Sequence, residues 1–543
     1  MKLNRLVTCA GLLWLLATGM SVQAGGMVEQ WGVFQIILPG PTNGNPFVDT
    51  TLAARFTQGD VTIEATGFYD GDGVYCVRFM PYREGEWHYT TVSSVSNLNH
   101  ISGDFTVVKP AAGNHGPVRV ANTYHFAYAD GTPYKELGTT CYAWVNQDEA
   151  LQEQTLKTLA SSPFNKLRMC VFPKRYDWNT NEPSMYPFVG IPTTNWDFTR
   201  FNPEYFRHFE QRIADLQKLG IEADIILFHP YDEGHWGFDR MPASADDRYL
   251  RYVLARLSAY RNVWWSLANE YDFMKQKTEA DFVRFGEIIS TNDPSHHLVS
   301  IHNGQKMFNH TLPWITHVSV QNGSAVEDAG RAELFRDIYR KPVVFDEVKY
   351  EGNLPKRWGN LSAEELVFRF WEGTVAGTYV GHGETYLSPD NIIWWSKGGV
   401  LKGQSPARLA FLQQVLADSP AEGIDPIDKW QDPYIGGQAG KYYLIYFGKK
   451  APMKWEFQLP KPPLGKGAPL TNGVAFTAEV LDTWNMTVTP VPGKFTVKKK
   501  GDYTYADEGG RSIELPGKSY VALRIKRVED QAFQPQINSD GHR

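Results

Sequence analysis

Two glutamates stand where apolar runs of strand length come to an end. A run rich in tryptophan and valine leads into Asn269 and Glu270. A second apolar run leads into Asp346 and Glu347. An unpaired charge is costly to bury, so a carboxylate in such a place is either solvated or functional. Two carboxyl groups that face each other can cleave a glycosidic bond, one as a proton donor and the other as a nucleophile or base. The two glutamates therefore predict cleavage of a sugar linkage.

The chain between residues 118 and 418 alternates between short apolar runs and amphipathic stretches, which is typical of parallel βαβ units. Eight such repeats fit one (β/α)8 or TIM barrel, an α/β fold whose active sites lie at the carboxyl ends of the strands. A doubly wound sheet is the alternative, but no glycine-rich phosphate loop follows any expected strand. Strands are expected at 136–141, 166–172, 222–228, 262–268, 298–302, 315–320, 342–346 and 376–381. Helices are expected at 203–219, 247–260, 278–289 and 363–374, with a closing helix at 407–416.

Both flanks of this region carry the alternation of short β-strands. Residues 27–110 predict an N-terminal Ig-like β-sandwich, because alternating runs are separated by glycine, proline and asparagine turns. Residues 420–528 predict a second, C-terminal β-sandwich on the same grounds. The polar residues 529–543 predict a disordered tail. The expected order is therefore sandwich, barrel, sandwich.

The first 24 residues resemble a secretory signal peptide. Lys2 and Arg5 precede an apolar stretch, and small residues lead up to a cleavage point after Ala24. The mature protein is expected to be exported to the periplasm or the medium, without a membrane-inserted segment, because no later stretch is apolar enough to span. The net charge of −6 and the lack of a basic block argue against a nucleic acid partner.

Three cysteines lie beyond the signal peptide: Cys76, Cys141 and Cys170. So small and odd a number does not make a disulfide framework. A bridge between Cys141 and Cys170, which lie in adjacent expected strands, stays open, although buried thiols are the expectation.

The two glutamates and their neighbours resemble the retaining (β/α)8 glycoside hydrolases. In those enzymes an Asn-Glu pair after strand four carries the acid/base, and a glutamate after strand seven is the nucleophile. The resemblance implies that Glu270 is the acid/base and Glu347 the nucleophile. It also implies that Asn269 binds the sugar hydroxyl next to the anomeric carbon. Arg168 matches the strand-two arginine that hydrogen-bonds the nucleophile.

A narrower resemblance is to bacterial glycosidases that join an apiosidase-like barrel to an N-terminal sandwich. Their N-terminal motif stands here at residues 73–81 and 85–87, as GVYCVRFMP and GEW. The chain departs from the pattern of the larger group in one place, because no glycine directly follows the glutamate of strand seven. Asp346, Glu351 or Glu384 therefore stays open as an alternative nucleophile.

Further polar and aromatic residues follow the ends of the expected strands, where they would meet a sugar. In the loop after strand three, His229, Asp232 and His235 could together hold a metal ion. Their spacing matches no metallohydrolase signature, so we expect this loop to contact sugar hydroxyls and expect neither a metal nor a cofactor. The expected sugar-binding residues at the strand ends are Trp144, His229, Tyr231, Asp232, His235, Trp236, His302, Asn303, Gln321, His382, Glu384, Trp394 and Trp395.

Two other functions stay open at this point. A barrel that has lost its activity would only bind carbohydrate, and a polysaccharide lyase would act without a pair of glutamates. The absence of a Gly-x-Ser-x-Gly elbow from the sequence argues against a serine esterase. The partner is expected to be a carbohydrate substrate, and the sequence leaves open the sugar, its linkage and the oligomeric state.

Overall fold

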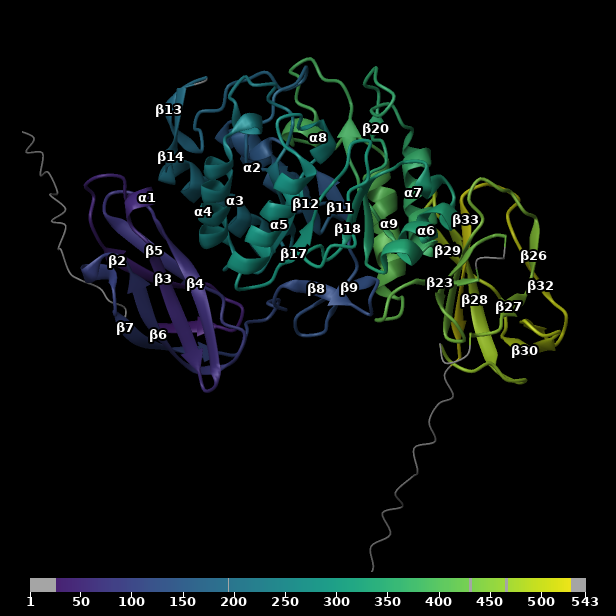
Figure 1. Ribbon diagram of the computed structural model, residues 1–543. Helices are drawn as coiled ribbons and strands as arrows, with labels where there is room; N and C mark the ends of the chain where they lie inside the picture. Colours follow the sequence, from purple (N-terminus) through teal and green to yellow (C-terminus); the bar gives the residue numbers. More distant parts are fainter. Residues whose placement is uncertain (1–25, 194, 429–431, 464–466, 529–543) are drawn as a thin grey trace, which may run out of the picture.

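The computed structural model describes residues 26–193, 195–428, 432–463 and 467–528. The expected signal peptide and the expected disordered tail lie outside these residues. Three parts of the described chain lie in a row in Figure 1: an N-terminal sheet, a central α/β unit and a C-terminal sheet. Among the described residues, no helix has both the length and the apolar character needed to cross a membrane.

The central unit is built on eight parallel strands that follow one another in chain order. The first five form one sheet and the last three form another. A parallel bridge between Thr139 and His382 joins the first strand to the chain just after the last one, so the whole sheet is barrel-like. The strands are β11 (Gly138–Thr140), β12 (Lys166–Cys170), β15 (Glu222–Phe228), β16 (Val263–Ala268), β17 (Leu298–Ser300), β18 (Val318–Gln321), β19 (Val343–Glu347) and β21 (Tyr379–Val380).

Helices cover the outside of this sheet, and the strands are buried on both faces. Every residue of β15 and β16 is buried, so apolar and polar residues do not alternate along these strands, and the acidic Glu222 and Asp224 of β15 are buried as well. Polar caps start the helices: the Asn202 side chain accepts from the Glu204 backbone, and Thr278 and Asp281 form a capping box. The helices are α2 (Glu149–Leu159), α3 (Pro203–Lys218), α4 (Ala243–Leu257), α5 (Glu279–Asn292), α6 (Ala329–Tyr339), α7 (Ala363–Val375) and α9 (Ser405–Ala417), with the short α1 (Pro46–Asp49) and α8 (Trp394–Lys397).

The N-terminal sheet has seven strands and curls over itself. Phe34 in one edge strand stacks on Phe105, which lies near the other edge, with ring centroids 3.7 Å apart. Both rings belong to one buried apolar cluster, so the curled sheet encloses its own core. The strands are β1 (Gly26–Glu29), β2 (Phe34–Pro39), β3 (Leu52–Gln58), β4 (Val61–Tyr69), β5 (Val74–Phe79), β6 (Gly85–Ser93) and β7 (Ser102–Val108).

Buried arginines join the N-terminal sheet to helices α3 and α4 of the central unit. Arg78 in β5 donates to Glu210 Oε2 at 3.0 Å and to the Arg256 carbonyl at 2.8 Å. Arg256 in turn pairs with Asp70 of the N-terminal part at 2.7 Å. The Phe68 ring lies beside both guanidinium groups, 4.9 Å from Arg78 and 4.4 Å from Arg256. The contact is therefore a buried ionic network with aromatic support.

The C-terminal sheet has nine strands and packs against helix α7 through an apolar contact. The ring of Trp371 stacks on Tyr446 with centroids 5.5 Å apart. Its strands are β23 (Asp425–Asp428), β24 (Ile435–Gln438), β25 (Tyr442–Tyr446), β27 (Gln458–Pro460), β28 (Ala475–Asp482), β29 (Thr487–Pro490), β30 (Phe495–Lys500), β31 (Thr504–Asp507) and β33 (Val521–Arg527). The remaining small sheets pair β8 (Val118–Ala121) with β9 (His125–Tyr128) and β10 (Pro133–Tyr134), β13 (Phe188–Ile191) with β14 (Asn195–Phe201), β20 (Glu351–Gly352) with β22 (Glu384–Thr385), and β26 (Lys454–Glu456) with β32 (Ser512–Glu514).

Several local expectations can be compared with these elements. Helix α4 begins at Ala243, earlier than expected, because Pro242 stands directly before the helix and does not need a backbone N–H there. The hairpin β13–β14, between strand two and helix α3, was not expected from the sequence. Cys76, Cys141 and Cys170 are free and buried, so the open bridge is not formed.

The ionic contact between the N-terminal sheet and the central unit should dominate the stability of that junction. Replacing Arg78 with methionine leaves Glu210 paired with Arg256 but removes its buried hydrogen bond to Arg78, which should cost about 1.5–3 kcal/mol. Urea denaturation of the Arg78→Met protein should show this loss in the free energy of unfolding. The control is Arg55→Met, whose pair with Glu64 is exposed and should contribute less than about 1 kcal/mol. Equal, small losses in the two variants would contradict a junction held by charge.

Candidate active site

Glu270 and Glu347 lie at the carboxyl ends of two strands of the barrel-like sheet. Glu347 ends β19, and Glu270 follows β16 by two residues. Gln321 in β18 is the strand partner of Glu347, and its side chain also interacts with the carboxylate of Glu270. Glu270 and Glu347 therefore lie at one edge of the sheet, close enough for the charge of Glu347 to act on Glu270.

The backbone at Glu270 adopts a left-handed conformation, with φ 47° and ψ 54°. A residue with a side chain rarely takes this conformation, which costs about 1–3 kcal/mol and occurs mainly where function requires a fixed geometry. The turn brings the carboxylate into a buried position, with only 5% of the residue exposed.

The carboxyl group of Glu270 is held in its protonated form at neutral pH. Burial, followed by the nearby negative charge of Glu347, raises the pKa of Glu270 to about 8. Lys174 and Gln321 oppose this shift more weakly. A glutamic acid with such a pKa can donate a proton near neutral pH.

The carboxyl group of Glu347 is held in its ionised form. Burial alone would raise the pKa of Glu347, but His302, Arg168, the Tyr142 hydroxyl and Lys174 together hold this pKa below its ordinary value. Burial and the charge of Arg168 lower the pKa of His302 to about 4, so His302 is neutral at pH 7. The lasting positive charge beside Glu347 is therefore that of Arg168, because burial lowers the pKa of Lys174.

A buried ionic network lies directly beneath the two glutamates. Lys166 Nζ lies 3.0 Å from Asp346 Oδ1 and 3.0 Å from Glu136 Oε1. Arg168 Nε lies 3.3 Å from Asp224 Oδ2 and 3.8 Å from Asp346 Oδ1. Asp346 also accepts a hydrogen bond from a serine of β18, and its pKa is lowered well below the ordinary value by Arg168 and Lys166 against the effect of burial. These contacts give Asp346 a structural role and point it away from the nucleophile position.

Arg168 makes different contacts from those implied by the resemblance. It donates to Asn269 Oδ1 at 3.2 Å and to Ser266 Oγ at 3.3 Å. Within the described chain no hydrogen bond joins Arg168 to Glu347, so it acts on that carboxylate through its charge. The contact with Asn269 leaves the amide nitrogen of this residue without a partner among the described residues, which suits it to donate to a ligand.

Aromatic side chains surround Glu347, and the sequence analysis missed most of them. The Tyr142 hydroxyl donates to Glu347 Oε1 and lies 3.4 Å from the Tyr350 hydroxyl. Trp395, which was expected here, lies in the same cluster. Partly exposed members of this aromatic cluster are Tyr176, Trp178 and Trp358. The high aromatic content of the loops after strands two and seven could have indicated these residues from the sequence.

Lys174 is a second residue that the sequence analysis missed. It lies four residues beyond β12, is only 3% exposed, and has its ammonium group 3.6 Å from the ring centroid of Tyr142. The Tyr231 ring, which was expected at the site, lies on the same ammonium group at 4.1 Å.

The loop after β15 does not form the metal site that the sequence left as an alternative. His229 Nε2 donates to the Phe172 carbonyl at 3.1 Å while its Nδ1 accepts from the Tyr231 backbone, so both nitrogens are used. The carboxylate of Asp232 accepts backbone N–H groups of its own loop. His235 instead pairs with Glu182, as does Trp236. These four residues shape the loop, and among them His235 is the most open to solvent.

His302 and Asn303 lie where the sequence placed them, after β17. The ring of His302 is fully buried, and neither of its nitrogens has a hydrogen-bond partner. Asn303 Oδ1 accepts from the Gln321 backbone at 3.2 Å. These residues support the glutamate pair from the side of strands five and six.

The expectation that Trp144 and Trp394 face a sugar was wrong. Trp144 is completely buried and donates to the sulfur of Met169 at 3.2 Å. Trp394 is 3% exposed and donates to Thr139 Oγ1 at 2.9 Å. Both side chains belong to the main buried apolar cluster of the central unit, Trp144 from the turn after β11 and Trp394 from the first position of α8.

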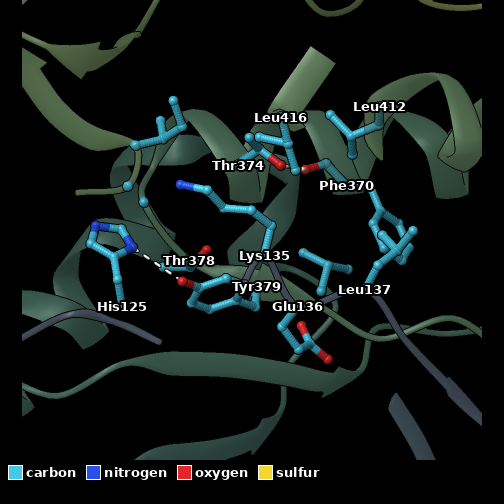
Figure 2. A pocket seen from close by; sticks show the side chains of 14 residues that line it. His125, Lys135, Glu136, Leu137, Phe370, Thr374, Thr378, Tyr379, Leu412 and Leu416 are labelled. Atoms are coloured by element: carbon cyan, nitrogen blue, oxygen red, sulfur yellow. Dashed lines mark hydrogen bonds between the residues drawn. The ribbon is translucent and has the colours of Figure 1, made fainter. Parts of the chain in front are cut away.

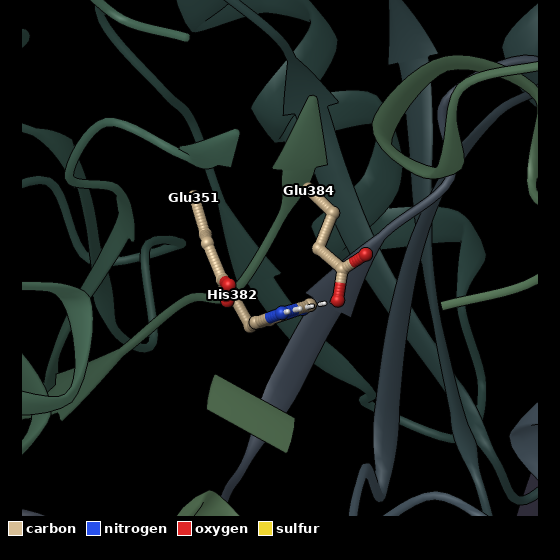
Figure 3. A group of neighbouring side chains, drawn as sticks. All are labelled: Glu351, His382 and Glu384. Carbon is tan, nitrogen blue, oxygen red and sulfur yellow. Dashed lines mark ion pairs between the residues drawn. The ribbon is translucent and has the colours of Figure 1, made fainter. Parts of the chain in front are cut away.

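His382 and Glu384 were also expected at the sugar site, but they form a separate buried cluster with Glu351 (Figure 3). Glu351 accepts the backbone N–H groups of Gln404 and Ser405 at the start of α9. Glu384 accepts from the Lys402 backbone at 2.7 Å. Their contacts tie the sheet to α9 and do not include Glu270 or Glu347. This placement disfavours Glu351 and Glu384 as nucleophiles.

The same three residues have potential metal-ligand atoms within 4.8 Å of one another. The hydrogen bonds around His382 argue against a metal. Thr139 Oγ1 accepts from Trp394, and among the described residues its own proton has no acceptor other than His382 Nδ1 at 2.8 Å. His382 Nε2 then carries a proton, which faces Glu384 Oε1 at 3.8 Å instead of offering a lone pair to a cation.

A cavity at the opposite end of the strands is too small for a sugar. It lies between Lys135, Leu137, Tyr379 and the neighbouring side chains of α7 and α9 (Figure 2). Its volume is about 30 Å³, enough for a single water molecule.

Comparisons with known proteins cover all three parts of the chain. The sequence profile of an apiosidase-like catalytic domain matches residues 120–431. Profiles of two domains of unknown function, DUF5060 and DUF5605, match residues 27–94 and 430–526. A search of curated proteins gave no match.

Two solved structures show how far the similarity extends. A candidate glycoside hydrolase from Bacteroides vulgatus is 42% identical, with a TM-score of 0.90 over 93% of this chain and 100% of that chain. A glycoside hydrolase family 5 protein from the same species is 15% identical, with a TM-score of 0.55 over 76% of this chain and 93% of that one. The second likeness is one of fold alone.

The opposite protonation states of the two glutamates can be tested without a substrate. Replacing Glu347 with glutamine removes the negative charge that raises the pKa of Glu270, so Glu270 should lose its proton at a lower pH than in the unmodified protein. Infrared difference spectroscopy of the protonated carboxyl stretch during a pH titration measures this shift. The control is Glu233→Gln, an exposed glutamate that shares the left-handed backbone of Glu270. An unchanged titration of Glu270 in the Glu347→Gln protein would contradict the coupling.

Proposed function

The chain belongs to the apiosidase-like family, and from this premise we propose that it is a retaining glycoside hydrolase with Glu270 as acid/base and Glu347 as nucleophile. Family membership and the similar Bacteroides vulgatus structure support glycosidase activity. The observation that carries the finer proposal is the placement of the two glutamates at the carboxyl ends of β16 and β19, where their surroundings raise the pKa of Glu270 and lower that of Glu347. Pairs of carboxyl groups whose surroundings separate their pKa values in this way serve as acid and base.

The proposed reaction has two steps. Glu347 attacks the anomeric carbon while Glu270 gives its proton to the departing oxygen, which leaves a glycosyl ester on Glu347. Glu270, now ionised, removes a proton from water, and the water oxygen breaks the ester and restores both groups. This course implies carboxyl groups about 5–5.5 Å apart, since a wider gap would admit the water of an inverting enzyme.

Neighbouring residues would position the reacting groups. The Tyr142 hydroxyl orients Glu347 through its hydrogen bond. Arg168 holds the oxygen of the Asn269 amide, which leaves the nitrogen to donate to the hydroxyl next to the anomeric carbon. Trp395 and Tyr231 would contact the apolar face of the sugar.

We further propose that the central unit is a (β/α)8 barrel. Eight parallel strands in chain order and the bridge between Thr139 and His382 support it. In such a barrel the carboxyl ends of the strands form one mouth, which explains why residues of strands one, four and seven converge.

The two alternatives from the sequence make different predictions. A barrel that only binds carbohydrate has no need for two glutamates with separated pKa values. A polysaccharide lyase eliminates across the ring and releases an unsaturated sugar, so its product absorbs ultraviolet light. A hydrolase releases a saturated reducing end, and measuring both products on one polysaccharide panel distinguishes the three functions.

The cellular setting rests on the sequence alone. We propose that residues 1–24 direct export, so that the enzyme meets a poly- or oligosaccharide in the periplasm or the medium. A carbohydrate is the only partner that this proposal requires.

The loss of rate on removing the proposed acid, Glu270, should depend on the leaving group of the substrate. Glu270→Gln should lower kcat/KM on natural substrates roughly hundredfold to ten-thousandfold, because the departing oxygen receives no proton. Nitrophenyl glycosides should lose much less in the first step, because their leaving groups depart without a proton. The matched control Glu233→Gln should keep its activity on both substrate types. Equal rates of Glu270→Gln and the unmodified enzyme on a natural substrate would contradict the assignment.

A further inference from the structure

Lys174 places its side-chain nitrogen inside the proposed site without a carboxylate partner among the described residues. Burial lowers the pKa of this group, so an anion bound beside it would favour its charged form. Its ammonium group lies between two aromatic rings, 3.6 Å from the centroid of Tyr142 and 4.1 Å from that of Tyr231. Tyr176 and Trp395 lie farther out, at 5.2 and 5.6 Å. Aromatic faces attract a cation, but they offset only part of the cost of removing an ammonium group from water.

Other buried lysines of the chain show what is missing at Lys174. Lys166 pairs with Asp346 at 3.0 Å, and Lys277 pairs with Asp246 at 2.6 Å. Lys174 has no carboxylate within 4.0 Å and no hydrogen bond from its ammonium group among the described residues. The side chain is 3% exposed, so water cannot fully replace such a partner.

The two nearby carboxyl groups do not fill this gap. Both glutamates, Glu270 and Glu347, are close enough for their charges to act on Lys174. Glu347 is already engaged by the Tyr142 hydroxyl, and Glu270 carries a proton at neutral pH. The ammonium group lies over the face of the ring whose hydroxyl binds Glu347, so it is about one tyrosine ring away from the proposed nucleophile.

We propose that Lys174 binds a carboxylate carried by the sugar ring itself, so that the substrate is a glycoside of a uronic acid. This inference rests on the proposed function of Glu270 and Glu347. The short separation from the nucleophile favours an anion on the ring over one on a distant branch. A uronate would otherwise be repelled by the ionised Glu347, and the ammonium group offsets this repulsion.

Matched pairs of nitrophenyl glycosides test the proposal directly. Glucuronide and glucoside, and galacturonide and galactoside, differ only in a carboxylate at the last carbon, and both anomers of each are used. The enzyme should cleave one uronide faster than its neutral partner. Lys174→Met should lower kcat/KM for that uronide about tenfold to hundredfold, the usual loss for a hydrogen bond to a charged group, mainly through KM.

Two further variants separate recognition from a general loss of structure. Lys174→Arg keeps the positive charge and should keep the preference for the uronide. The control Lys356→Met removes an exposed lysine whose ammonium group lies 5.8 Å from the centroid of the Trp178 ring in the same aromatic cluster. In this variant kcat/KM for both glycosides of each pair should stay within about threefold of the value for the unmodified enzyme. Rates are compared at the plateau of each pH profile, because Lys174 also acts on the pKa values of the glutamates.

The inference is overturned if the enzyme cleaves the neutral glycoside faster in every pair. It is also overturned if Lys174→Met lowers kcat/KM for the uronide and for its neutral partner by the same factor. Either result leaves the proposed function intact as long as turnover still depends on Glu270 and Glu347. If no nitrophenyl glycoside is cleaved, calorimetric titration with D-glucuronate and D-galacturonate decides the question. Binding that is lost in Lys174→Met supports the inference, and absent or unchanged binding overturns it.

Discussion

The buried ionic network of Lys166, Arg168, Asp224 and Asp346 fixes the geometry on which the proposed site depends. Removing charges from water is expensive, and such a network is stable only when each charge has a partner in good geometry. Here the two cations come from one strand, β12, and they tie together the strands β15 and β19. Because Arg168 also holds Asn269, the residue before Glu270, the network reaches both glutamates at once.

The adjacent residues Asp346 and Glu347 at the end of β19 have different roles, one structural and one in the proposed chemistry. Asp346 faces the network and is fully paired, while Glu347 faces the aromatic residues and Tyr142. The alternation of side chains along a strand makes this division possible without any extra element. The same arrangement explains why the positive charge of Arg168 keeps Glu347 ionised while burial keeps Glu270 protonated. Stability and the proposed chemistry thus share one set of contacts.

The sequence predicts the positions of Glu270 and Glu347 because an apolar run that stops at a carboxylate is a local signal. It also predicts the order of strands and helices, since their periodicity is local. It does not tell which of two adjacent residues faces the site, which is why Trp394 and Trp395 were treated alike although only Trp395 lies in the aromatic cluster. His382 lies outside the site because of a long-range contact with Thr139, and Lys174 lies within it because loops after strands two and three meet. Such contacts depend on packing between distant segments, which a single sequence does not specify.

The central claim is that Glu347 forms a covalent bond with the sugar. The most direct measurement is mass spectrometry of peptides after the enzyme has reacted with a panel of fluorinated glycosides that trap the glycosyl intermediate. The account predicts one added sugar on the peptide that contains Glu347, and none when Glu347 is replaced by glutamine. An adduct on Asp346, Glu351 or Glu384, or a first product with inverted configuration and no adduct, would contradict it.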